Sequence, residues 1–120
     1  MRKSNVLVGL FVVLAWPLNA GERLKMAVSP AVAFAPATVR VRATVEANPE
    51  NRAIQIVAES PEFYRSSEIP LDGAHAPRTT IVEFRSLPGG SYTVTAVLIR
   101  VNDRTTASQP LNVVGRGMAE

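Results

Sequence analysis

The sequence predicts an all-β fold: an antiparallel β-sandwich of about seven strands, preceded by a signal-peptide helix. After residue 20 the chain alternates apolar and polar residues with a period of two, and no stretch keeps a helical period. Proline, glycine and Asn-Asp turn signals interrupt this alternation about every eight to twelve residues, which is typical of sandwiches and barrels. The remaining length suffices for one small domain with a single core.

Residues 1–20 have the layout of a secretory signal peptide. A short positive segment with Arg2 and Lys3 precedes an apolar run at residues 6–16, and Ala20 offers a small residue for cleavage. A helix of that length rises only about 17 Å, which is too short for a hydrocarbon core of about 30 Å. We therefore expect cleavage, no stable membrane span afterwards, and a secreted or periplasmic bacterial protein. The alternative is an uncleaved N-terminal membrane anchor.

The first strand of the domain is expected to be split. Residues 24–36 are apolar but contain Pro30 and Pro36, and proline cannot donate to a sheet ladder. We predict that this strand breaks and can change sheets. The predicted segments are therefore a signal peptide (1–20), an N-terminal segment with a split first strand (21–36), a sandwich core (37–115) and a flexible tail (116–120).

Two well-patterned strands follow. The alternation over residues 38–46 is strict, so one face should be buried and the other solvated. A turn at 48–51 leads to a strand at 53–59. The residues expected to point inward are Val39, Val41, Ala43 and Val45 in the first strand, and Ile54, Ile56 and Ala58 in the second.

The second half of the domain begins with a less regular stretch, residues 60–77. We expect a short strand at 63–65 and a short extended piece at 69–73 there. Beyond it, strands are predicted at 79–85, 91–101 and 105–114. The last two are joined by a tight Asn102-Asp103 hairpin, and Pro110 predicts an edge position for the closing strand.

The segment from residue 84 to residue 96 is the most informative motif. A strand ends, a Pro-Gly-Gly turn follows, and an alternating strand starts at Tyr92. We expect Leu87 to plug the end of the core, and Gly89 and Gly90 to permit positive φ at the crossing. The Tyr92 ring can then be buried while its hydroxyl bonds to upstream backbone, as in the tyrosine corner of immunoglobulin-type sandwiches.

This segment carries a resemblance to a known group of domains. Residues 87–98 resemble the corresponding corner of fibronectin type III-like and bacterial immunoglobulin-like (Ig-like) domains, and residues 35–39 resemble the opening of polycystic-kidney-disease-type repeats. The resemblance implies an Ig-like sandwich over residues 25–114, and it implies almost nothing about function. The Cys…Trp…Cys pattern of antibody domains and the Trp-x-Phe-Gly-Asp motif of the polycystic-kidney-disease repeats are both absent.

Charge and cysteine content exclude several functions. The formal net charge of +3 falls to +1 once Arg2 and Lys3 leave with the leader. Basic and acidic residues are then interspersed along the chain without a basic cluster on one face, so we expect no nucleic-acid partner. Cysteine is absent, which excludes disulfides, thiolate metal sites and cysteine nucleophiles. The exported domain must therefore be held by its core alone.

Candidate catalytic side chains do not form a recognisable set. His75 follows Asp72 at three residues, but a metal site or a catalytic triad needs further partners. The loose acidic group Glu59, Glu62 and Glu68 is more typical of a solvated loop than of glycosidase carboxylates. We therefore predict no enzymatic activity, no catalytic or metal-binding residues and no cofactor.

One strand face predicts an interaction surface. The outward residues Val97, Ile99 and Val101 are apolar, and an Ig-like sheet places Val57 beside them. Such a patch often marks a partner surface, so we expect an exported binding or structural-interaction module that contacts another envelope protein or itself. The alternative is that the N-terminal segment or the 60–77 connection covers the patch.

A second candidate surface is the segment Phe63-Tyr64-Arg65. Its two aromatic rings could form a platform for a sugar, with Arg65 and nearby glutamates as polar partners. On this alternative the protein is a carbohydrate-binding module. Exposed, coplanar rings of Phe63 and Tyr64 would favour it.

Overall fold

The computed structural model describes residues 23–115, so the predicted signal peptide and the predicted tail at 116–120 lie outside the described residues. The described part contains eight strands and one short 3-10 helix, and within it no helix is long and apolar enough to cross a membrane. The elements are β3 (Leu24–Ser29), β4 (Val32–Phe34), β5 (Ala37–Val45), β6 (Asn51–Ser60), β7 (Phe63–Pro70), η1 (Gly73–His75), β8 (Thr79–Leu87), β9 (Gly90–Arg100) and β10 (Arg104–Val114).

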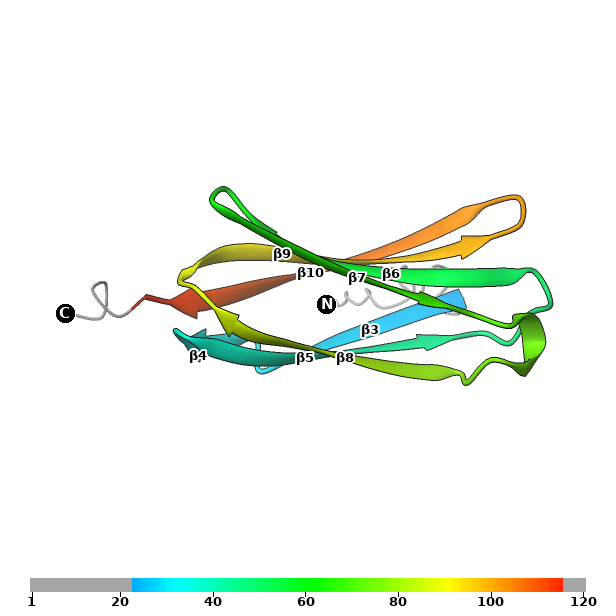
Figure 1. The fold of residues 1–120 in the computed structure, drawn as a ribbon, viewed down its shortest axis with the longest axis horizontal. Coiled ribbons are helices and arrows are strands. Elements are labelled where there is room, and N and C mark those ends of the chain that lie inside the picture. The colour runs from blue at the N-terminus through cyan, green and yellow to red at the C-terminus, as the bar shows by residue number, and fades with distance from the viewer. Residues whose placement is uncertain (1–22, 116–120) are drawn as a thin grey trace, which may run out of the picture.

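The strands form two sheets packed as a sandwich, with one layer above the other in Figure 1. The five-stranded sheet has the order β4-β10-β9-β6-β7, and the three-stranded sheet has the order β3-β5-β8. All strand pairs are antiparallel except β4 with β10. The predicted all-β sandwich is confirmed. The described residues contain eight strands where about seven were predicted, because the split first strand supplies one strand to each sheet, β3 to one and β4 to the other.

The first strand changes sheets at a proline. β3 pairs with β5 in the three-stranded sheet, whereas β4 pairs with β10 in the other sheet. Pro30 stands between the two halves, where a residue without an N–H cannot continue the β3 ladder. The side-chain amide Nε2 of Gln109 donates to the carbonyl of Met26 at 2.9 Å, which ties the two sheets together on this side.

The buried core consists of the apolar residues that recur at every second position of the strands. Every second residue of β5, from Ala37 to Val45, is buried, and the inward residues of β6 and β9 face them from the other layer. Full burial of one Val or Leu side chain contributes about 1.5–3 kcal/mol, so this double row holds a domain without disulfides. The principal fully buried side chains are Leu24, Val39, Val41, Ile54, Ile56, Leu87, Val94, Leu98, Leu111 and Val113.

The stretch 60–77 is more regular than its sequence predicts. Instead of two short pieces it contains one continuous strand, β7, which pairs with β6 along its whole length. A two-residue turn, Pro61-Glu62, fixes this register because Ser60 and Phe63 pair directly across it. Pro70 ends the strand at the sheet edge, where the missing N–H breaks no pairing.

The expectation that Pro110 marks an edge strand is wrong. β10 lies between β9 and β4. β4 pairs only with residues 112–114 of β10, and the N–H of Asn112 donates to Ala31 on that side. Backbone N–H groups alternate sides along a strand, so the nitrogen of Pro110 also points to the β4 side, beyond the end of that short strand. The proline therefore interrupts no ladder.

Candidate interaction surfaces

The turn between β8 and β9 is a tyrosine corner, as predicted. The Tyr92 hydroxyl donates to the Pro88 carbonyl at 2.6 Å, and the side chain is only 3 % exposed. Its ring meets the Phe63 ring edge-on, with the centroids 6.2 Å apart. Burial raises the pKa of the Tyr92 hydroxyl above its ordinary value. Leu87 is fully buried and closes this end of the core.

The prediction of positive φ at Gly89 and Gly90 in this turn is wrong. Among the described residues, positive φ occurs at Ser86 and Gly73, and neither Gly89 nor Gly90 has it. Gly89 is required for close approach, because a Cβ there would lie 2.6 Å from the Gly115 Cα. Gly90 would meet its neighbours at an ordinary 3.5 Å. The turn therefore needs one glycine for space and none for a left-handed backbone.

The structure brings the predicted apolar patch together on the outer face of the five-stranded sheet. Val57, Val97 and Ile99 are half-buried on the neighbouring strands β6 and β9, while Val101 is exposed just beyond the end of β9. The register sets Val57 opposite Thr95 and Val97 opposite Gln55. We call these four apolar residues, together with the Thr and Gln side chains between them, the five-strand face.

Other elements leave this face open within residues 23–115. β7 lies at the edge of the same sheet, and β3 belongs to the opposite layer, so neither predicted cover lies over it. Further large apolar side chains border the face on the outer strands. Val32 (61 % exposed) and Phe34 (71 %) lie on β4, and Tyr64 (59 %) lies on β7.

The segment 63–65 does not form a paired aromatic platform. Consecutive strand residues point to opposite faces, so Phe63 packs inward against Tyr92 while Tyr64 points outward. The Arg65 guanidinium lies 5.0 Å from the centre of the Phe63 ring and donates to the Arg85 carbonyl of β8. Arg65 is therefore engaged in joining the edges of the two sheets.

The candidate catalytic groups lie apart from one another. His75 is exposed in η1, beside Asp72 in a shallow hollow at the end of the sandwich. The carboxyl groups at positions 59, 62 and 68 are exposed on β6, on the β6–β7 turn and on β7. In the part of the chain that the structure describes, no three His, Asp or Glu side chains gather closely enough to hold a metal.

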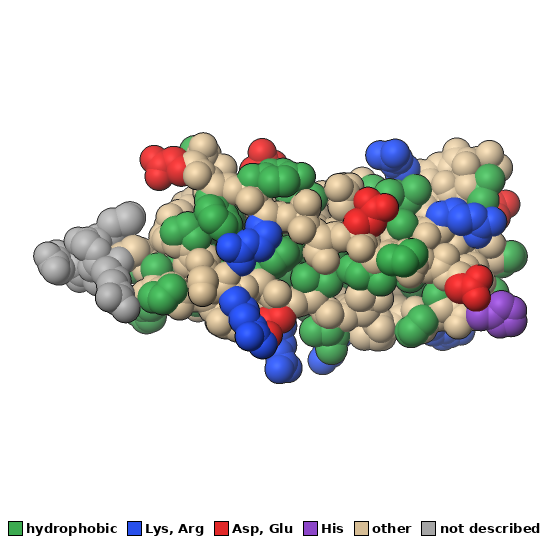
Figure 2. Space-filling model, viewed as in Figure 1, with side chains coloured by type: hydrophobic (Ala, Val, Ile, Leu, Met, Phe, Trp, Pro, Cys, Tyr) green, Lys and Arg blue, Asp and Glu red, His purple; other side chains and the backbone are tan. Residues whose placement is uncertain are grey.

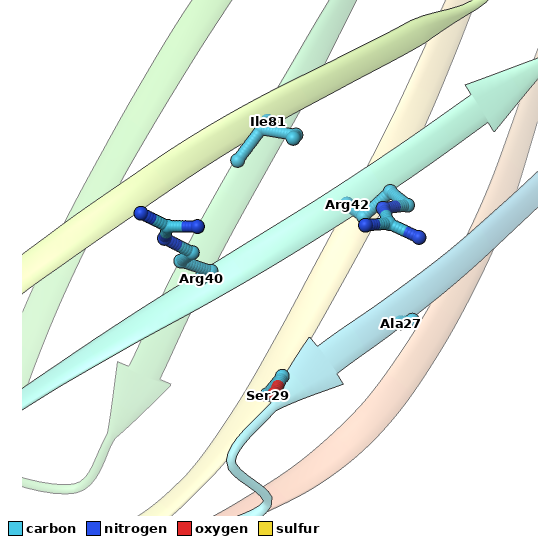
Figure 3. A pocket seen from close by; sticks show the side chains of 5 residues that line it. All are labelled: Ala27, Ser29, Arg40, Arg42 and Ile81. Atoms are coloured by element: carbon cyan, nitrogen blue, oxygen red, sulfur yellow. The ribbon is translucent and has the colours of Figure 1, made fainter.

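A second surface was missed by the sequence analysis. The outer face of the three-stranded sheet has a hollow of about 290 Å³ lined by Arg40 and Arg42 of β5. Figure 3 shows both arginines between Ile81 of β8 on one side and Ala27 and Ser29 of β3 on the other. The expectation of no basic cluster is wrong. Strand alternation places Arg40 and Arg42 on the same face of β5, and the pairing of β5 with β3 and β8 places Lys25 and Arg85 on that face as well.

Comparison with known proteins shows the fold and no more. No protein-family model matches the chain, and no curated protein matches it. Among solved structures, it is similar to a superoxide reductase (neelaredoxin) from Ignicoccus hospitalis, with a TM-score of 0.62 and 15 % identity over 77 % of this chain and 80 % of that one. It is also similar to the sulfur carrier protein SoxY from Chlorobium limicola f thiosulfatophilum, with a TM-score of 0.56 and 14 % identity over 76 % and 78 % of the two chains. At such low identity these structures support a small all-β sandwich and assign no activity.

Proposed function

We propose that this protein is an exported, non-enzymatic binding module that contacts another protein of the cell envelope through its five-strand face. The observation that carries the proposal is the half-buried apolar row on β6 and β9, which continues to the exposed Val101 and which no described element covers. The signal-peptide layout of residues 1–20 supports export.

The chemistry of the face supports a protein partner. Outward side chains near its centre are Val, Ile, Thr, Ser and Gln, and the Thr95 and Ser108 hydroxyls are hydrogen-bonded to each other at 3.2 Å. The charged side chains Glu59, Glu68 and Arg104 lie toward its margins, near the end of β6, on β7 and at the start of β10. Protein interfaces have this arrangement, with charge depleted at the centre and a polar rim.

The deciding variant is Val97→Asp, and Ile81→Asp is its matched control. Both replace a β-branched apolar residue on an outer sheet face by aspartate, but Ile81 lies on the opposite layer. Each variant is checked for unchanged urea unfolding, and each is then used to capture partners from envelope extract. Sedimentation velocity of the purified protein tests for a second copy as partner.

We expect Val97→Asp to lose the captured protein, and Ile81→Asp to retain it. Equal capture by both variants overturns the proposal. Unfolding of Val97→Asp alone would place the side chain in a packed interior and would also overturn it. Cleavage of the predicted signal peptide is tested separately by the intact mass of the exported protein, because an exported species that begins at Met1 refutes cleavage.

A further inference from the structure

The outer face of the three-stranded sheet is strongly basic. Its outward side chains form rows across β3, β5 and β8, set by the pairing register of these strands. Lys and Arg side chains project along the lower border of Figure 2, the side on which this sheet lies in Figure 1. At one end of this face Glu46, directly after β5, lines a separate hollow with Lys25 and Arg78. Within the three strands, the charged members of the rows are Lys25, Arg40, Arg42 and Arg85, against the single carboxylate of Glu83.

That single carboxylate is shared by two arginines. Glu83 lies 2.8 Å from the Nε of Arg85 and 3.7 Å from the Nε of Arg40. The two guanidinium groups lower the pKa of the Glu83 carboxyl, Arg85 more than Arg40. One positive charge remains uncompensated in this trio, in addition to those of Lys25 and Arg42.

Arg42 has no charged residue directly across from it on either neighbouring strand. Its cross-strand neighbours are Ala27 on β3 and Ile81 on β8, so neither can pair with a cation. Among the ion pairs of residues 23–115, none includes Arg42. Arg40 is the neighbouring outward residue of β5, about 7 Å from Arg42 along the strand. The Ser29 hydroxyl lies on the same hollow.

We propose that this hollow binds the carboxylate or sulfate groups of an acidic polysaccharide. Arg42 is the main contact, through the two parallel N–H groups of its guanidinium, which match an oxyanion. Arg40 holds a further anionic group along the same chain, and Ile81 and Ala27 form an apolar floor. This site lies on the opposite layer from the five-strand face and does not depend on the function proposed for that face.

The other anionic macromolecules fit this surface less well. Single-stranded nucleic acid needs aromatic side chains to stack its bases, and no aromatic residue lies on the outward rows of β3, β5 or β8. Peripheral membrane binding combines basic residues with apolar side chains that enter the lipid, whereas Ile81 is the only large apolar residue on these rows. A hollow also receives a flexible chain better than it receives a bilayer surface.

The test measures binding of fluorescent oligosaccharides to the mature protein by anisotropy, with heparin fragments as the sulfated probe and oligogalacturonate as the carboxylated probe. The variants are Arg42→Gln and Arg42→Lys, with Arg104→Gln as the matched control. Arg104 is also an exposed strand arginine, but it lies on the other sheet. Parallel arms use phosphatidylglycerol vesicles and a DNA oligonucleotide at the same ionic strength.

We expect the wild type to bind at least one oligosaccharide, and we expect added salt to weaken that binding. Arg42→Gln should weaken it about tenfold or more, whereas Arg104→Gln should leave it unchanged. Arg42→Lys should bind several-fold more weakly than the wild type, because it keeps the charge without the planar fork. Equal losses for Arg42→Gln and Arg104→Gln overturn the site, and wild-type affinity in Arg42→Lys overturns recognition by the guanidinium. Tighter binding of vesicles or DNA, or no binding of either oligosaccharide, overturns the ligand class.

Discussion

Replacing Tyr92 by Phe removes one buried hydroxyl and leaves the ring in place. The hydroxyl donates to the Pro88 carbonyl at 2.6 Å, and the ring meets Phe63 at 6.2 Å between centroids. The net contribution of such a hydrogen bond is about 1 kcal/mol. This hydrogen bond is only partly buried, so the larger penalty for a fully buried acceptor without a partner does not apply to the Pro88 carbonyl. We therefore expect the free energy of unfolding to fall by about 1 kcal/mol.

Equilibrium urea unfolding of the mature domain measures this change directly. For a domain of this size, about 1 kcal/mol corresponds to a lowering of Tm by about 4–8 °C. The m-value should not change, since the variant buries the same surface. Tyr64→Phe is the control, because that side chain is 59 % exposed and its substitution should stay within about 0.5 kcal/mol of the wild type.

Two results would refute the reasoning. A Tyr92→Phe midpoint equal to that of the wild type means that the hydroxyl bond adds nothing to stability, and the tyrosine corner then has no energetic role. A loss above about 3 kcal/mol exceeds what one hydroxyl contributes and means that the ring has moved from its contact with Phe63.

Three further predictions concern the same molecule. Burial raises the pKa of Tyr92 in the folded state, so its contribution to the free energy of unfolding is complete below about pH 10, the ordinary tyrosine pKa, and is lost as the pH rises through the folded-state pKa. Between about pH 9 and 11, the urea midpoint of Tyr92→Phe should therefore fall less than the urea midpoint of the wild type. Gly89→Ala should lower the free energy of unfolding by about 1–3 kcal/mol, because its Cβ would lie 2.6 Å from the Gly115 Cα. The Glu83 carboxyl should titrate below its usual range by carbon-13 NMR, and Arg85→Gln should raise its pKa.

Each of these predictions has a nearby control. For the pH series, the urea midpoint of Tyr64→Phe should fall with pH about as much as that of the wild type. An equal fall in Tyr92→Phe and in the wild type contradicts the assignment of this pH dependence to Tyr92. Gly90→Ala should change stability by less than about 0.5 kcal/mol, since its Cβ would meet atoms at 3.5 Å; equal losses at the two glycines contradict the close-approach argument. Arg40→Gln should raise the Glu83 pKa less than Arg85→Gln does, because its guanidinium is more distant.

Strands with one buried face could be predicted closely from the sequence. The expected strand at 38–46 is observed at Ala37–Val45, and the one at 91–101 is observed at Gly90–Arg100. In both, apolar residues recur at every second position, which only an extended chain can place on one face. The tyrosine corner was predictable as well, because its turn and its ring lie within a few residues of each other along the chain.

The strand β7 could not be predicted as one piece because its sequence lacks that alternation. Ser66, Ser67 and Glu68 are all polar, and their side chains do not distinguish a buried face from an exposed one. Pairing with β6 and the two-residue turn at 61–62 decide the structure instead. For the same reason Phe63 and Tyr64, neighbours in sequence, could not be assigned to opposite faces until the strand was seen to be continuous.

The basic hollow depends on register between strands, which sequence periodicity does not give. Alternation alone places Arg40 and Arg42 on one side of β5. Only the pairing of β5 with β3 and β8 shows that Arg42 lies between Ala27 and Ile81 while Glu83 lies beside Arg40. A shift of β8 by two residues would keep every side chain on its face, yet it would bring Glu83 opposite Arg42 or opposite Thr38 instead of Arg40.

The two outer faces have different chemistry because each sheet draws its outward residues from different strands. β6 and β9 are central strands of the five-stranded sheet, and their outward residues are mostly uncharged β-branched side chains. β5 is the central strand of the other sheet, and its outward residues are Thr and Arg. The buried core lies between these faces, so substitutions at Val97 and at Arg42 share no contacts and should act independently. One small domain can therefore hold a protein on one side and an anionic chain on the other, and each variant serves as a control for the other surface.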